Sequence, residues 1–494
     1  MATDWAWSAD NLQLTFTIRD GILWSDGTPF TANDVVYTFN AYLENAALAA
    51  GGARVVAPIL ASVQVGGATP EGSPAASPVA SPAASPAASG NTVVFTFSEV
   101  NTIALYDVAS QVIVPQHQWS QVADPVLFTN ETPIGTGPFT EVARFETQIW
   151  ELHKNPNYWQ AEKIGINGLR FPAYPDNDAA ILALLNGDVD WAGNFIPDIE
   201  NTFISENPEA YNYWFPATGA TVHLFLNTSM APFDNADVRK AISMAIDRDQ
   251  VVSIAMYDYT HPADATGLSD AYTNWKDQAS VDAPWVKLDV AGANAMLDAA
   301  GLTMDGNFRK NADGSTLTYE LNVVTGWSDW VQSCDIMAQN LADIGIQVTV
   351  RPYDFSTWLE KVNNGDFTMS IGWSSGGSTP YNFYRGMMAT ATWNAVGTTS
   401  NENWHRFKSE EADAALAAFA TTSDQAEQME LGKQLQAIYA ANAPAIPLFP
   451  GPQWGEFSTA RFDGFPNEEN PYAILSPYAG ERGLVLTALT TKTV

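Results

Sequence analysis

The sequence predicts an α/β protein of two or three domains. Short alternating strands are followed by amphipathic helices along most of the chain, as at residues 317–324, 346–354 and 355–363. A chain of 494 residues exceeds what one hydrophobic core supports, and an apolar content of 46% is ample for folded domains. We therefore expect mixed open sheets covered by helices, and we detect no internal repeat.

The charge and the rare residue types exclude several classes of function. The 22 basic and 55 acidic residues give a formal charge of −33, which opposes binding to nucleic acid or to anionic lipid surfaces. Cys334 is the single cysteine and lies in an apolar pattern with helical spacing, so we expect a buried structural thiol. The five histidines lack metal-ligand spacing, and we expect neither a metal site nor a cofactor.

Catalytic motifs are equally sparse. The sequence contains neither the GxSxG pattern of a nucleophilic serine nor a serine–lysine pair of the lactamase type. A glycosidase needs only two suitably spaced carboxylates, and 55 acidic residues make any such pair uninformative. We expect a protein that is not an enzyme, with an enzyme as the rival class.

The first long pattern begins with apolar and polar residues alternating from Leu12 to Ile18. Turns follow at Gly21 and Gly27, and Thr31 is placed to cap a helix that begins at Ala32. The stretch FTIRDGILWSDGTPFTANDVVYTF resembles the signature of family 5 extracytoplasmic solute-binding proteins, the peptide-, nickel- and oligosaccharide-binding subunits of ABC importers. The later order of GTGPF, a strand pair and NPNYW at residues 135–159 is similar to the same family.

The resemblance implies a periplasmic-binding-protein-like fold of class II, cluster C type. Two mixed-sheet lobes would be joined by a hinge, with a small accessory subdomain. The expected division is an accessory subdomain of the first lobe at 1–145, the first lobe at 146–228 and 447–494, and the second lobe at 229–446. Members of the family normally carry a signal peptide, often a lipid-anchored cysteine, and a first strand before this point, none of which precedes Met1.

Residues 66–90 contain repeated SPxAS units and no aromatic ring. Such a segment buries too little apolar surface to order itself, and we expect a disordered surface insertion. The flanking residues 63–65 and 92–97 have strand patterns, so the insertion should extend the tip of a hairpin.

Residues 168–191 have the pattern of a strand, a helix at 178–186 and a second strand. We expect a β-α-β unit of one open sheet, in which ligands bind beyond the carboxyl ends of the strands. That expectation places Trp191 and Asn194 at the edge of a cleft. An alternative role for Trp191 is simply to cover the sheet.

The stretch from Phe367 to Arg385, FTMSIGWSSGGSTPYNFYR, predicts a strand that leads into a ligand-binding loop with aromatic edges. Peptide-binding relatives carry a loop aspartate after the Gly-Trp pair, which holds the α-ammonium group of the peptide. Residues 372–380 contain no acid. A loop of hydroxyls and rings suits a neutral polyhydroxylated ligand, a cello-, manno- or xylo-oligosaccharide, and a peptide is the alternative because a carboxylate could come from another loop.

The candidate ligand-binding residues are therefore aromatic rings for stacking and small polar groups for hydrogen bonds. They are Trp373, Ser374, Ser375, Tyr381, Asn382, Trp327, Trp404, Trp191, Asn194 and Trp275. The resemblance implies the transmembrane permease subunits of an ABC importer as partners. It also implies a monomer in the periplasm or at the cell surface, lipid-anchored in its precursor.

Overall fold

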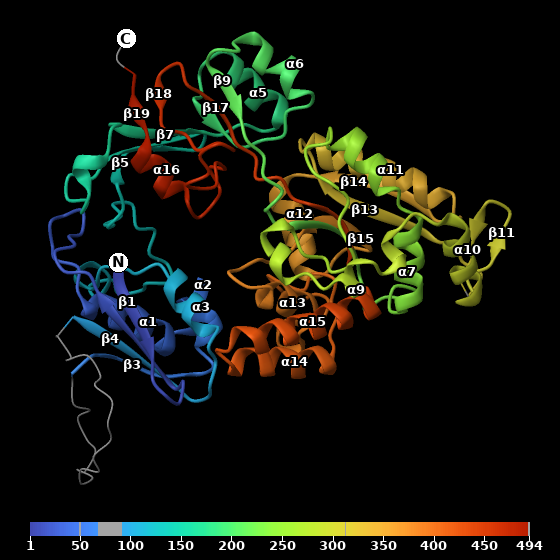
Figure 1. Ribbon diagram of the computed structural model, residues 1–494, viewed down its shortest axis with the longest axis horizontal. Coiled ribbons are helices and arrows are strands. Elements are labelled where there is room, and N and C mark those ends of the chain that lie inside the picture. Colours follow the sequence, from blue (N-terminus) through green and yellow to red (C-terminus); the bar gives the residue numbers. More distant parts are fainter. Residues whose placement is uncertain (49–50, 68–90, 312, 493–494) are drawn as a thin grey trace, which may run out of the picture. The chain divides into compact units, whose positions relative to one another are not determined.

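The computed structural model describes residues 1–48, 51–67, 91–311 and 313–492 (Figure 1). The chain forms two compact units. The first comprises residues 1–173 and 420–423, and the second comprises residues 174–419 and 424–494. The expected division into an accessory subdomain and two lobes stays a prediction, and the core of the expected insertion, residues 68–90, lies outside the described residues.

The first unit contains two antiparallel sheets. Their strand orders are β1-β2-β4-β3 and β5-β6-β7. The strands are β1 (Ala2–Trp7), β2 (Gln13–Ile18), β3 (Leu60–Val65), β4 (Thr92–Phe97), β5 (Phe139–Glu146), β6 (Ile149–Lys154) and β7 (Gly168–Pro172). The helices are α1 (Ala32–Glu44), α2 (Gly51–Val56), α3 (Ala104–Ser110) and α4 (Gln116–Trp119). The expected hairpin on either side of the insertion is confirmed, because β3 and β4 pair antiparallel.

The alternation of inward- and outward-facing residues along the strands explains the core of the first sheet. Leu14, Phe16 and Ile18 of β2 point inward and pack with Phe95 of β4, while the intervening threonines are more exposed. Phe39 of α1 contacts Phe95 edge to face at a centroid distance of 4.8 Å. One face of α1 therefore closes the core of this sheet.

Helix α1 begins as its sequence predicts. The Thr31 hydroxyl accepts a hydrogen bond from the backbone of Asn33 at 3.3 Å, and Asp34 Oδ2 accepts one from the Thr31 backbone at 2.8 Å. This reciprocal capping box satisfies amide groups that have no partner within a helix.

We expect Thr31→Ala to lower the free energy of unfolding of the first unit by about 1 kcal/mol, because the Asn33 amide loses its acceptor. Thr31→Ser keeps a hydroxyl and should recover most of the loss. Urea titration followed by circular dichroism measures both variants. Equal losses in the two variants would show that the hydroxyl does not cap the helix.

The second unit holds most of the helices. They are α5 (Asn177–Leu185), α6 (Ile199–Thr202), α7 (Ala236–Ala245), α8 (Arg248–Gln250), α9 (Gln278–Val281), α10 (Val290–Ala299), α11 (Ser328–Ala342), α12 (Phe355–Asn364), α13 (Tyr381–Met388), most of α14 (Glu410–Thr421), α15 (Gln425–Asn442) and α16 (Arg482–Ala488). Its strands are β8 (Trp191–Ala192), β9 (Tyr211–Tyr213), β10 (Thr221–Leu226), β11 (Met304–Asp305), β12 (Phe308–Arg309), β13 (Thr318–Val324), β14 (Gln347–Tyr353), β15 (Met369–Trp373), β16 (Ile446–Pro450), β17 (Glu456–Ser458), β18 (Phe462–Asp463) and β19 (Thr490–Thr491).

The main sheet of the second unit has the strand order β14-β13-β15-β10-β16 and mixes parallel with antiparallel pairs. Helices cover both of its faces (Figure 1). Leu224 and Ile371 on one face pack against α7, α10 and α11, and Cys334 of α11 is fully buried there, as expected. On the opposite face, Ser370 accepts a hydrogen bond from Trp358 of α12 at 3.1 Å, and Phe225 contacts Trp404. Every residue of β10 is consequently buried.

The expected β-α-β unit at residues 168–191 is wrong. Strand β7 belongs to the sheet β5-β6-β7, whereas β8 lies in the three-stranded sheet β8-β17-β9. The two residues of β8 pair with β17, so the partner of this strand comes from residues 456–457 near the end of the chain. Local sequence patterns contain no information about such a distant partner.

Helices long enough and apolar enough to cross a membrane do not occur among the described residues.

Candidate ligand-binding site

The candidate loop is attached to the middle of the main sheet. Strand β15 lies between β13 and β10, and Trp373, its last residue, is opposite Val222. The Ser374 backbone donates to the Thr221 carbonyl at 3.1 Å. The Tyr272 hydroxyl forms hydrogen bonds of 2.8 Å with both the amide and the carbonyl of Gly377. These contacts hold the loop at both its base and its tip.

Five tryptophans gather beside this loop. Trp373 lies 5.2 Å from Trp358 and 5.2 Å from Trp404 between ring centroids, and Trp327 and Trp330 are each 6.3 Å from Trp373. Trp330, Trp358 and Trp404 are buried, whereas Trp327 and Trp373 are only half-buried. The two half-buried rings are the members of the cluster with accessible surface for a ligand.

The glycine before Trp373 is required by this packing. A Cβ atom on Gly372 would lie 3.0 Å from Phe225 and 3.0 Å from Trp404, closer than ordinary van der Waals contact. The Gly-Trp pair thus lets the aromatic cluster approach the strand.

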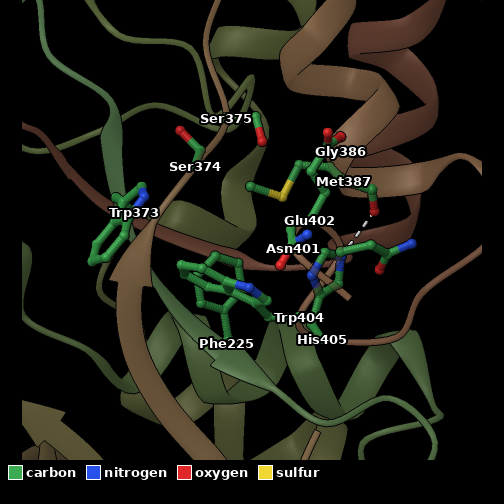
Figure 2. Close-up of a pocket in the computed structure, with 11 residues that line it drawn as sticks. Phe225, Trp373, Ser374, Ser375, Gly386, Met387, Asn401, Glu402, Trp404 and His405 are labelled. Atoms are coloured by element: carbon green, nitrogen blue, oxygen red, sulfur yellow. Dashed lines mark hydrogen bonds between the residues drawn. The ribbon is translucent and has the colours of Figure 1, made fainter. Parts of the chain in front are cut away.

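A small pocket of about 30 Å³ opens between the loop and residues 401–405. Figure 2 shows Ser374 and Ser375 at one end of it, Phe225 and Trp404 at the other, and the thioether of Met387 between them. By this measure one water molecule needs about 10–15 Å³, so the pocket accommodates only about two water-sized groups. The pocket therefore suits one protruding group of a ligand, and the body of the ligand must lie outside it.

A histidine closes the floor of this pocket. The His405 Nε2–H donates to the Met387 carbonyl at 2.8 Å, shown as the dashed line in Figure 2. Complete burial lowers the pKa of His405 to about 3, so the ring is neutral near pH 7. His405 therefore lines the pocket as an uncharged ring.

The second half of the predicted loop is a helix. Residues 381–388 form α13, and Phe383 and Tyr384, expected at the edge of a loop, are fully buried. The Tyr384 hydroxyl donates to the Thr266 carbonyl at 3.0 Å, and Phe383 packs against Tyr439 at 5.6 Å. Burial of these rings stabilises a helix that the local Gly-, Ser- and Pro-rich sequence does not indicate.

The pocket contains a carboxylate that lies outside the predicted loop. Glu402 Oε1 forms an ion pair of 2.8 Å with Arg385 of α13, and both side chains are mostly buried, with 25% and 20% of their surfaces exposed. The carboxylate therefore already has a cationic partner. Sequence reasoning missed three residues here: Glu402, Arg385 and Trp358. No periodic pattern marks residues 401–405, and Trp358 appears as an ordinary core residue of α12.

The other predicted residues lie in two further places. Tyr381 and Trp275 contact Phe419 from centroid distances of 5.6 and 6.0 Å, and Trp275 also covers Gly432 of α15. Trp191 donates its indole N–H to the Leu475 carbonyl at 2.7 Å and contacts Phe465. These contacts let Trp191 cover part of the β8-β17-β9 sheet, the alternative role considered for it, and its role in ligand binding stays a prediction.

Asn194 is linked to a buried acid. Its backbone N–H donates to Glu456 Oε2 at 3.3 Å, and Glu456 on the central strand β17 is fully buried. Within the described ranges, Asn194 Oδ1 and Glu456 Oε1 have no hydrogen-bond partner. Burial raises the pKa of Glu456 to about 8, because the charged form loses its hydration.

In the part of the chain that the structure describes, no group of three His, Cys, Asp or Glu side chains is placed to hold a metal ion.

Comparisons with known proteins find relatives that are described as peptide-binding proteins. A di/tripeptide-binding protein of Pseudomonas aeruginosa is 25% identical over 370 residues, which cover 72% of this chain and 64% of that protein. An oligopeptide-binding protein of Bacillus subtilis is 23% identical and covers 97% of this chain and 83% of its own length. The crystal structure of a mannohexaose-bound periplasmic oligopeptide-binding protein of Thermotoga maritima is similar with a TM-score of 0.86 at 23% identity. It covers 100% of this chain and 90% of that chain.

The fold shared with these proteins is that of periplasmic-binding-protein-like solute-binding proteins, as expected from the sequence. The family described as bacterial extracellular solute-binding proteins, family 5 Middle, matches residues 1–395. The chain therefore belongs to family 5 of the bacterial extracellular solute-binding proteins, which agrees with the resemblance at residues 16–39.

Proposed function

We propose that this protein is the solute-binding subunit of an ABC importer and captures a neutral oligosaccharide of the cello-, manno- or xylo- type. The ligand stacks on Trp327 and Trp373 and forms hydrogen bonds with Ser374 and Ser375. The loaded protein then delivers it to the permease subunits. The protein acts outside the cytoplasm as a monomer, without a cofactor and without turning over its ligand.

The observation that carries this proposal is the pair of half-buried indoles beside a loop that contains no acid. The apolar faces of a pyranose ring complement flat aromatic surfaces, while its hydroxyls exchange hydrogen bonds with small polar groups. The nearest carboxylate in the pocket, Glu402, is already paired with Arg385. An ammonium group would thus meet a neutral ion pair rather than a free anion.

The structural relative from Thermotoga maritima supports the sugar assignment, since it was crystallised with mannohexaose. The names of the relatives from Pseudomonas aeruginosa and Bacillus subtilis favour a second candidate, a di-, tri- or oligopeptide. The two ligand classes differ in charge. The peptide terminus requires a carboxylate to compensate its ammonium group, whereas a neutral sugar does not.

Titration calorimetry with cello-, manno- and xylo-oligosaccharides in parallel with tripeptides separates the two candidates. We expect heat of binding from at least one oligosaccharide series and none from the peptides. Tight peptide binding without a sugar signal would overturn the assignment. Incubation of the protein with the bound oligosaccharide should leave it intact, and cleavage would identify an enzyme instead.

A further inference from the structure

One face of α13 points toward the candidate loop and the pocket. Asn382, Arg385 and Gly386 are three and four residues apart and therefore lie on the same side of the helix. A Cβ on Gly377 would lie 2.6 Å from Asn382 Nδ2, and one on Gly386 would lie 3.0 Å from Ser375 Oγ. The face thus packs directly against loop residues 375–377.

Three polar atoms on or beside this face share one property. They are buried and have no hydrogen-bond partner among the residues that the structure describes: Asn382 Oδ1, Arg385 Nε and Glu402 Oε2. We call them the open atoms. A buried polar atom without a partner is costly, so each is a place where a ligand group can add a hydrogen bond.

The open atoms differ in character. Arg385 Nε carries a hydrogen and can only donate, whereas Glu402 Oε2 and Asn382 Oδ1 can only accept. Arg385 Nη2 and Glu402 Oε1 form an ion pair of 2.8 Å, so the charges of the two side chains compensate each other. A complementary ligand group must both accept and donate while carrying no charge.

We infer that Arg385 and Glu402 form a subsite that reads one hydroxyl group of the ligand. A hydroxyl accepts from Arg385 and donates to Glu402 in a single position. An ammonium group offers donors alone, leaves Arg385 Nε unpaired and lies beside a guanidinium of the same charge. This inference rests on the proposed function, since it names the group through which the neutral ligand is recognised.

Gly386 keeps the space for that hydroxyl. A Cβ at this position would lie 3.5 Å from Glu402 Oε2 as well as 3.0 Å from Ser375 Oγ. The added methyl would occupy part of the small pocket lined by these residues. Inside a helix alanine is more favourable than glycine, and this preference counters the cost of displacing the Ser375 hydroxyl that the added methyl would meet.

The test is titration calorimetry with the oligosaccharide that binds the unsubstituted protein best. We expect Glu402→Gln to weaken binding by about tenfold to a hundredfold, because a charged hydrogen bond is lost. Gly386→Ala should weaken binding by a comparable factor while the variant stays folded. Glu320→Gln is the matched control, since Glu320 forms an ion pair of the same 2.8 Å length with Arg351 at an exposed position.

The outcomes separate the inference from the proposed function. If the unsubstituted protein binds no oligosaccharide, the proposed function fails. If it binds one and both Glu402→Gln and Gly386→Ala stay within about twofold of the control, the subsite alone is wrong. Tripeptide binding that disappears in Glu402→Gln would show that the carboxylate holds an ammonium group, and would overturn the inference. Circular dichroism verifies the fold of each variant, and Gly386→Ala remains decisive if Glu402→Gln does not fold.

Discussion

We expect the free energy of unfolding of the Glu456→Gln variant to fall much less from about pH 5 to about pH 8 than that of the unsubstituted protein, and to be nearly constant above about pH 7. Glu456 is fully buried on β17, and burial raises its pKa from 4.5 to about 8. The folded state therefore holds a proton that the unfolded chain releases above about pH 4.5. Stability from this group is complete at low pH and is lost as the pH rises toward 8.

The expected size of the effect follows from the shift. Each pH unit between the two pKa values costs about 1.4 kcal/mol, so the range from about pH 5 to about pH 8 amounts to roughly 4 kcal/mol. Burial also raises the pKa of Asp329 to about 7. The free energy of unfolding therefore decreases with rising pH because of this group too, and that decrease ends about one pH unit lower. Asp329→Asn should accordingly remove only the part below about pH 7.

Urea unfolding at a series of pH values measures these differences. Glu468→Gln, at an exposed position, is the control for the loss of one acidic group from a chain with a charge of −33. It should follow the curve of the unsubstituted protein. A Glu456→Gln curve with the same fall as the control would show that Glu456 ionises as readily when folded as when unfolded.

The second large effect is expected from Trp373. Trp373→Ala removes a ring from the proposed stacking surface and should weaken oligosaccharide binding by about 30-fold or more, the usual loss at a central tryptophan. It also removes contacts with Trp358 and Trp404 at 5.2 Å, at a cost of about 3 kcal/mol in stability.

Trp275→Ala provides the comparison for that variant. Trp275 is also half-buried, but it packs on Phe419 of α14 and Gly432 of α15. Its removal should therefore lower the melting temperature and change the affinity by about twofold or less. Calorimetry and thermal unfolding of both variants distinguish loss of the site from loss of stability. Equal losses of affinity would mean that the ligand is not held at the Trp373 loop.

Much of the fold could be predicted because its signals are local. The Thr31 cap, the helix around Cys334 and the strand that ends at Trp373 depend on neighbouring residues, and the structure has each of them. Helix α13 was missed because Gly376, Gly377 and Pro380, which come just before it, suggest a loop. Burial of Phe383 and Tyr384 against distant side chains outweighs that local preference.

The candidate site was predictable only in part, for the same reason. Trp373 ends strand β15, and Ser374 and Ser375 follow it directly, so the three residues could be read together from the sequence. Glu402 comes from an irregular segment, and only tertiary packing brings it to Arg385. The pairing of β8 with β17 likewise depends on residues far apart in the chain, which no local pattern records.

The antiparallel pairing of β10 with β16 also affects biosynthesis. Residues 221–226 gain this partner only after residues 446–450 have been translated. At ordinary rates the ribosome needs on the order of tens of seconds for that interval. Long-range pairing further slows folding, so the nascent polypeptide stays without its native core for much of its synthesis.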